Sequence, residues 1–282
     1  MSTAPSSVLN LDDEVRRIAR EGAPDRYLAA LLAPQRARAG LIALAAFAAE
    51  IEKIPRQVSE PHLGEIRIQW WRDALAPSAK FEASGHPVAD AVTLAIAQHG
   101  LTAASFDDFL DAHVHSLYAD APETDGQLQL ELDMTEGALF RLAARCLGAP
   151  ETEIESARDV IQHAAEAYGL TRLALQLPYS LSRGRMPLPP SLAPADANDP
   201  AQLRAALQRV CALARSHLAH VSSAYAAQPK SIRTALLPVA LVEPYLRALS
   251  DAAHDPRRDL ADIAPLTRTW RLAKTHMRGR IG

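Results

Sequence analysis

A chain of 282 residues is long enough for one large domain or two small ones with a substantial core. Hydrophobic residues form 48% of it, which excludes a disordered chain, and the formal net charge of −3 argues against a protein that binds nucleic acid through a basic surface. The two cysteines, Cys146 and Cys211, are too few for a disulfide scaffold and predict buried thiols in a reducing compartment. We therefore expect a globular cytoplasmic protein without a nucleic-acid partner.

Hydropathy gives no sign of a membrane-spanning segment. The longest apolar run covers residues 39–49, well short of the roughly 20 residues that cross a bilayer. Residues 1–5 carry no basic region followed by an apolar one, so we expect no secretory signal there. We expect residues 1–8 to be a disordered N-terminus and residues 9–282 to form a single domain.

Along the chain, apolar residues recur with helical spacing. The pattern i, i+3, i+4, i+7 is clear in residues 41–48 and 139–146, and helical spacing continues through residues 203–218. Gly148 is placed to end the second of these helices, and Asn198 or Asp199 to cap the third. No segment alternates as a strand would, so the predicted fold class is all-α.

Prolines divide the predicted helices from one another. The one long irregular stretch covers residues 183–200, which we interpret as a surface loop within one domain rather than as a boundary between two. Prolines where the periodicity breaks are Pro34, Pro55, Pro61, Pro77, Pro87, Pro122 and Pro150.

The most informative block is EIRIQWWRDAL, residues 65–75. Trp70 and Trp71 point about 100° apart on a helix, so one can enter the core while the other faces a neighbouring helix or a cavity. Arg72 can reach carboxylates or phosphates. From these residues alone, an aromatic anchor beside a solvated arginine is favoured over a binding site.

As a string, however, this block resembles the signature of the squalene/phytoene synthase family. Residues 25–28 (DRYL) and 43–47 (ALAAF) resemble the family's opening helices, and residues 184–189 (GRMPLP) resemble its "GR-x-x-LP" segment. The resemblance implies an isoprenoid-synthase helical bundle around a deep central cavity. Active members condense two prenyl diphosphates head to head with Mg²⁺, which two aspartate-rich motifs hold from facing helices.

The first of these motifs is degenerate here. By alignment through the family's opening helices, its three acidic positions correspond to Glu52, Lys53 and Arg56, so only one acid is kept. Magnesium at a diphosphate needs carboxylate oxygens in near-octahedral geometry, which cations cannot supply. Pro55 is expected to end the helix that carries the motif. The family's diphosphate-binding arginine aligns with Ala49.

The second motif is also degenerate. Counting back from the "GR-x-x-LP" segment places Gln176, Tyr179 and Ser180 at its acidic positions, and Arg172 at a polar asparagine position. Glu166 is the one carboxylate between residues 165 and 179. We therefore predict no metal site and no catalytic residue. Three arginines remain candidates for ligand or anion contacts, namely Arg67, Arg72 and Arg172.

Three further strings resemble the subgroup of the family that lacks the aspartate motifs, which includes mitochondrial complex I assembly factors and bacterial relatives. They are residues 59–64 (SEPHLG), Pro178-Tyr179 ahead of residues 183–185, and Pro265-Leu266 followed by Trp270-Arg271. This resemblance implies a non-catalytic protein that needs no cofactor, with respiratory-complex subunits or an isoprenoid or lipid in the cavity as partners. The alternatives are an active head-to-head prenyl diphosphate synthase that requires Mg²⁺, and a lipid carrier.

Histidine pairs are the other candidate ligands. On a helix, His113 and His115 face different ways and do not share a metal. His217 and His220 can lie on one face, but the sequence offers no third ligand nearby.

Two segments of the chain are strongly charged. We interpret the acidic cluster Glu131, Asp133 and Glu136 as a solvated helix face. The basic C-terminus fits either a solvated helix end or peripheral contact with anionic lipid at the inner membrane, or with an acidic partner. Its cations are Arg268, Arg271, Lys274, Arg278 and Arg280.

Overall fold

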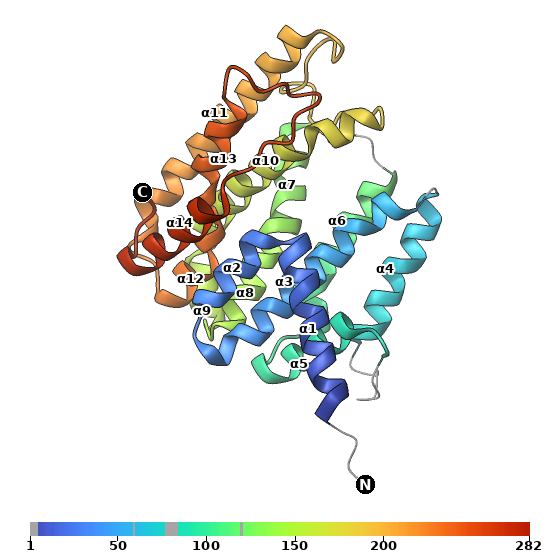
Figure 1. Ribbon diagram of the computed structural model, residues 1–282, viewed down its shortest axis with the longest axis vertical. Helices are drawn as coiled ribbons and strands as arrows, with labels where there is room; N and C mark the ends of the chain where they lie inside the picture. The colour runs from blue at the N-terminus through green and yellow to red at the C-terminus, as the bar shows by residue number, and fades with distance from the viewer. Residues whose placement is uncertain (1–4, 59, 77–83, 119–120) are drawn as a thin grey trace.

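The computed structural model describes residues 5–58, 60–76, 84–118 and 121–282. In these ranges the chain forms helices joined by loops and has no strand, which confirms the all-α prediction (Figure 1). The short helical turns are η1 (Ala103–Phe106), η2 (Asp133–Gly137) and η3 (Leu237–Leu241). The α-helices are α1 (Pro5–Gly22), α2 (Pro24–Leu32), α3 (Gln35–Gln57), α4 (Pro61–Leu75), α5 (Pro87–His99), α6 (Asp107–Tyr118), α7 (Asp125–Leu132), α8 (Ala138–Cys146), α9 (Glu151–Ser156), α10 (Arg158–Ser182), α11 (Pro200–Tyr225), α12 (Lys230–Ala235), α13 (Val242–Leu249) and α14 (Pro265–Arg278).

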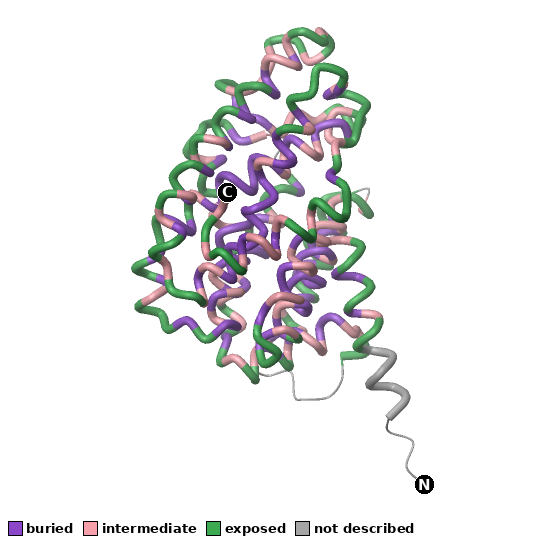
Figure 2. The backbone as a smooth tube through the Cα atoms, turned by 60° about the vertical axis from the view of Figure 1, so that its left-hand side comes forward, coloured by how far each residue is buried: buried purple, intermediate pink, exposed green. Residues whose placement is uncertain are grey.

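Two large hydrophobic clusters and a smaller third one, between α2, η3, α13 and α14, form the core. Of the two large clusters, one gathers around the long antiparallel pair α10 and α11, and the other around the alanine-rich α3, whose small side chains allow α1, α2 and α5 to pack closely (Figure 1). Helix α8 contributes to both, because Phe140 faces the first cluster while Leu139 and Leu142 face the second. Buried residues accordingly follow the inward sides of the helices (Figure 2).

Several predicted helix boundaries are confirmed. Asp199 caps α11 by accepting hydrogen bonds from the backbone N–H groups of Ala201, at 2.8 Å, and Gln202. Gly148 follows α8 with a φ of +86°, a left-handed conformation that favours glycine. The loop between α10 and α11 occupies residues 183–199.

One boundary prediction is wrong. Helix α3 does not end before Pro55 but continues to Gln57. Pro55 has no N–H to donate to the carbonyl of Ile51, so the last turn of the helix continues without that one hydrogen bond. Helix α1 is described from Pro5, and residues 1–4 lie outside the described ranges. Pro77 also lies outside them.

The tryptophan pair divides between core and surface. Trp71 is 4% exposed and meets Phe47 edge to face, with ring centroids 5.4 Å apart. Trp70 is 41% exposed and packs edge-on against Trp71, so only one of the two tryptophans enters the core. The reason is the roughly 100° between successive helical side chains.

Both cysteines are buried and free, as predicted, and burial raises the pKa of the Cys146 thiol to about 12. Among the described residues, no helix combines the length and apolar character needed to cross a bilayer.

Candidate functional site

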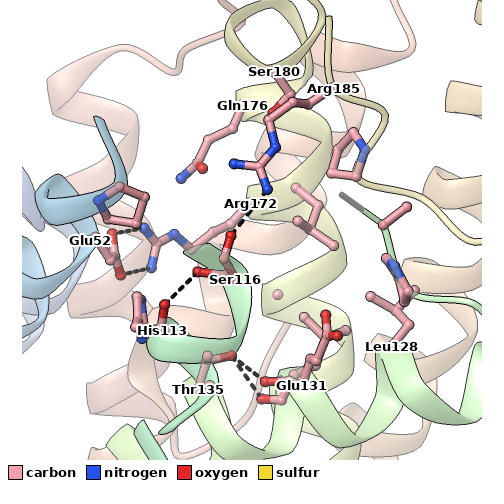
Figure 3. A pocket seen from close by; sticks show the side chains of 18 of the residues that line it. Glu52, His113, Ser116, Leu128, Glu131, Thr135, Arg172, Gln176, Ser180 and Arg185 are labelled. Atoms are coloured by element: carbon pink, nitrogen blue, oxygen red, sulfur yellow. Dashed lines mark hydrogen bonds and ion pairs between the residues drawn. The ribbon is translucent and has the colours of Figure 1, made fainter. Parts of the chain in front are cut away.

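A cavity of about 310 Å³ opens between the C-terminal end of α3, helix α6, the segment from α7 to η2, and helix α10 (Figure 3). The loop that follows α10 closes part of its rim with Arg183, Arg185 and Pro187. This volume lies at the small end of the range for small-molecule sites.

Most of the residues predicted from the two degenerate motifs line this cavity. Glu52 and Arg56 reach it from α3, and Arg172 with the second-motif positions reaches it from α10 (Figure 3). Lys53 does not line it and pairs with Glu50 on the same helix at 2.9 Å. The second-motif residues at the cavity are Gln176, Tyr179 and Ser180.

Arg172 is the centre of the site. Its Nη1 donates to Glu52 Oε1 at 2.8 Å and to Glu136 Oε1 at 2.8 Å, while its Nη2 donates to Glu52 Oε2 at 2.5 Å. Glu136 also accepts a hydrogen bond from Arg26. Glu52, Glu136 and Arg172 line the cavity and, together with Arg26 behind them, form a network in which two carboxylates and two guanidinium groups neutralise one another.

Electrostatics keep this pair ionised. Burial alone raises the pKa of Glu52, but the charge and hydrogen bonds of Arg172 outweigh it and hold the pKa below its usual value. Burial likewise disfavours the charged form of Arg172, but the carboxylates of Glu52 and Glu136 raise its pKa well above the usual range. Removing either partner would leave a charge in a poorly solvated place.

Glu136 corrects the prediction of a solvated acidic face. It is 6% exposed, because η2 is a single π-helical turn that rotates Glu136 toward α10. Gly169 allows that approach: a Cβ there would lie 2.6 Å from Leu132 Cδ2 and 3.3 Å from Glu136 Cγ. Asp133 instead pairs with Arg141 at 2.7 Å.

Arg67 and Arg72 lie outside the cavity. Arg72 pairs with Asp107 at 3.2 Å and with Asp111, which ties α4 to α6. Arg67 Nη1 donates to Gln57 Oε1 at 3.0 Å. In this structure both arginines connect helices and neither approaches the cavity.

His113 and His115 both border the cavity but have separate partners. His113 Nδ1 lies 2.7 Å from the carbonyl oxygen of Phe109, and burial lowers the pKa of His113, which favours the neutral ring. His115 Nε2 lies 3.2 Å from Gln127 Nε2. Among the described residues, neither histidine belongs to a cluster that could hold a metal ion.

The donors at this site do not fit the magnesium and diphosphate chemistry of the family's active members. Both carboxylates at the cavity, Glu52 and Glu136, already bind arginine. Magnesium requires several oxygen ligands in octahedral geometry, and a buried guanidinium repels it. The positions that face Glu52 from α10 carry a guanidinium, an amide and hydroxyls, in Arg172, Gln176, Tyr179 and Ser180.

The fold and the sequence together define the class. Residues 19–271 match the squalene/phytoene synthase family, and the chain belongs to that family. A dehydrosqualene synthase solved with a ligand superposes with a TM-score of 0.70 at 15% identity over 96% of this chain and 97% of that one. Squalene synthase HpnC from Alicyclobacillus acidocaldarius gives 0.62 at 14% identity over 98% and 97%. These structures confirm the isoprenoid-synthase bundle.

Proteins of similar sequence are named as assembly factors of complex I and not as synthases. "NADH dehydrogenase (ubiquinone) complex I, assembly factor 6" of Rattus norvegicus is 24% identical over 263 residues, which cover 88% of this chain and 78% of the relative. The human protein of the same name is 24% identical over 261 residues, covering 87% and 78%. The Bos taurus protein is 25% identical over 238 residues, covering 81% and 71%.

Proposed function

We propose that this protein is a non-catalytic member of the squalene/phytoene synthase family that acts in the assembly of respiratory complex I. The observation that carries the proposal is the partly buried contact of Arg172 with both Glu52 and Glu136. Relatives named complex I assembly factor 6 supply the choice of complex.

The charged groups at the cavity leave no excess of negative charge to hold a metal ion. Glu52 and Glu136 together carry two negative charges, and Arg26 and Arg172 carry two positive ones. To accept a magnesium cluster, the site would have to break contacts made at 2.5–2.8 Å and leave two buried guanidinium groups beside the metal. Each such step costs several kcal/mol in a poorly solvated site.

The cavity supports a ligand-binding role within the same proposal. Its rim carries Arg56, whose guanidinium lies over the Tyr179 ring at 4.7 Å, and Arg183, which donates to the Tyr179 hydroxyl. Apolar residues such as Leu128, Leu132 and Leu173 line the interior. This combination suits an isoprenoid or lipid with an anionic end, held without metal.

Helix α14 supports a place at the surface of the inner membrane. Leu266, Trp270 and Met277 are exposed, at 80%, 56% and 78%. Spacings of four and seven residues place them along one side of the helix. Arg271 and Lys274 lie close by in the chain and supply the charge that favours anionic lipid.

Two assays test the proposal. Purified protein supplied with farnesyl or geranylgeranyl diphosphate and Mg²⁺ should release no diphosphate above a protein-free blank, with an active family member as the positive control. Deletion of the gene should lower the amount and activity of complex I, and the wild-type gene should restore both. Sustained turnover would establish the alternative, an active head-to-head prenyl diphosphate synthase. Unchanged complex I would overturn the assembly role.

A further inference from the structure

Helices α10 and α11 pack against each other (Figure 1), and a cluster of imidazoles and carboxylates lies between them. Helix α10 contributes Asp159, His163 and Glu166, and helix α11 contributes His217 and His220. Spacings of three and four residues place these side chains on the facing sides of the two helices.

The outer part of the cluster has the geometry of a metal site. His220 Nε2 lies 2.6 Å from Asp159 Oδ2, and His163 Nε2 lies 3.8 Å from Asp159 Oδ1. One ligand atom from each of the three residues lies within 4.8 Å of the other two. Tetrahedral zinc with bonds of about 2.0–2.1 Å needs ligand atoms roughly 3.3 Å apart, so small side-chain rotations suffice.

The inner part of the cluster orients His163. His163 Nδ1 lies 2.8 Å from His217 Nδ1, and His217 Nε2 lies 2.8 Å from Glu166 Oε2. Glu166 is 2% exposed, so its carboxylate is fixed in the helix interface. If His217 donates Nε2–H to Glu166, its Nδ1 accepts from His163, and the lone pair of His163 Nε2 then faces Asp159.

In this arrangement two hydrogen-bond acceptors, His163 Nε2 and the Asp159 carboxylate, face each other. The Nε2 lone pair of His163 and the carboxylate of Asp159 repel each other unless a proton or a cation lies between them. A divalent cation satisfies both acceptors, and imidazole with carboxylate is a ligand set that zinc accepts.

We propose that Asp159, His163 and His220 bind one Zn²⁺ ion, with water completing the coordination. His217 and Glu166 are positioning residues, which act through the Nδ1 atom of His163 in the manner of outer-shell partners at other histidine-ligated metals. The ion joins α10 to α11 at the surface. The site is independent of the role in complex I assembly.

The test measures zinc binding to untagged, metal-free, full-length protein by isothermal titration calorimetry, and replaces zinc with Co²⁺ to read the ligand-field spectrum. The wild type should bind one ion per chain. H163Q and H220Q should weaken binding by more than the roughly 10–100-fold expected for H217Q, which removes an outer partner. H62Q is the control, because His62 is an exposed histidine on α4.

D159N keeps the experiment decisive if a histidine variant folds poorly, because the Asp159 side chain is 75% exposed and its loss should leave the fold intact. Helical circular dichroism verifies folding of every variant. Absence of stoichiometric binding to the wild type, or D159N and H220Q that bind as tightly as H62Q, would overturn the site. Loss of binding in H217Q with full binding in H220Q would also overturn this ligand assignment.

Discussion

Arg172 on α10 clamps Glu52 on α3 with two hydrogen bonds, although 120 residues separate them in the chain. One residue is the acid kept at the first degenerate motif, and the other is the arginine that precedes the second. The retained acid and the arginine are therefore complementary, because the carboxylate of Glu52 binds the guanidinium of Arg172 instead of a metal ion. At these two positions the side chains connect α3 to α10 and do not hold a metal ion.

The stability of the fold should depend on this pair. R172A leaves Glu52 without a cation while Glu136 keeps Arg26, so we expect a loss of about 3–5 kcal/mol in the free energy of unfolding. Urea denaturation measures it. R67A, at an exposed arginine outside the cavity, should change stability by less than about 0.5 kcal/mol.

A double variant distinguishes the effect of the unpaired Glu52 charge on stability from the effect of lost packing around Arg172. E52L/R172L removes both charges, so it should be more stable than R172L alone. If the two variants are equally stable, the charge of Glu52 is not what makes the loss of Arg172 costly.

The pair also predicts a pH dependence. The pKa of Glu52 is lower in the folded protein than its ordinary value of 4.5, so its ionisation stabilises the fold above pH 4.5. That stabilisation is lost as the pH falls through the folded-state pKa. The stability difference between wild type and E52Q should therefore be constant at neutral pH and shrink below 4.5. Other titrating carboxylates affect both proteins alike and cancel, so a difference that persists undiminished at low pH would contradict the assignment.

The two tryptophans should differ sharply in their contribution to stability. W71A removes a buried ring that contacts Phe47 and should cost about 3–5 kcal/mol. W70A removes a ring that is 41% exposed and should cost at most about 1–2 kcal/mol. Thermal and urea unfolding of both variants provide the comparison. Equal losses would mean that Trp70 is part of the core despite its exposure.

The sequence predicts the helices, the family and most of the cavity positions because these depend on local patterns. Apolar spacing marks the buried side of each helix, and the GR-x-x-LP segment fixes the count back to Gln176 and Tyr179. Trp71 is buried on the inward side of α4, and Asp199 caps α11, as these local patterns indicate. Local rules fail at Pro55, where the helix continues for two more residues although the ring has no N–H to donate.

The charge network could not be predicted in the same way. Glu136 follows an acidic stretch that looks solvated, and only the π-helical turn η2 rotates it inward. His163 completes the cluster with His217 and His220 from 54 residues away in the chain. Both depend on how α10 packs against its neighbours, and spacing within one helix carries no information about that.

Asp25 and Arg268 connect the two ends of the chain and provide a further test. Arg268 Nε lies 2.9 Å from Asp25 Oδ1, and Tyr168 and Tyr245 donate to the same carboxylate. Arg268 was expected in the basic solvated end, but its side chain is 11% exposed. A double-mutant cycle of D25N and R268Q should give a coupling of about 0.5–3 kcal/mol. The exposed pair Arg158–Glu155 is the control and should couple by less than about 0.5 kcal/mol. Equal coupling in the two cycles would show that burial adds nothing.

Binding of α14 to lipid vesicles tests the proposed location at the membrane surface. Three of the remaining cations, Arg271, Lys274 and Arg278, lie on the same helix as the exposed Trp270, and Lys274 Nζ lies 5.0 Å from its ring. Each basic residue near an anionic membrane contributes about 1 kcal/mol, so R271E/K274E/R278E should reduce partitioning onto vesicles with anionic phospholipid by roughly 100-fold or more. Sedimentation with the vesicles measures it.

The matched control for that experiment is R16E/R20E/R67E, which changes the net charge by the same amount through three exposed arginines on α1 and α4. It should bind nearly as the wild type does, because those arginines lie away from Trp270 in the chain and on other helices. Vesicles of phosphatidylcholine alone should bind neither protein strongly, since they offer no anionic charge. If both triple variants lose binding equally, overall charge rather than α14 governs the interaction, and the proposed contact surface is wrong.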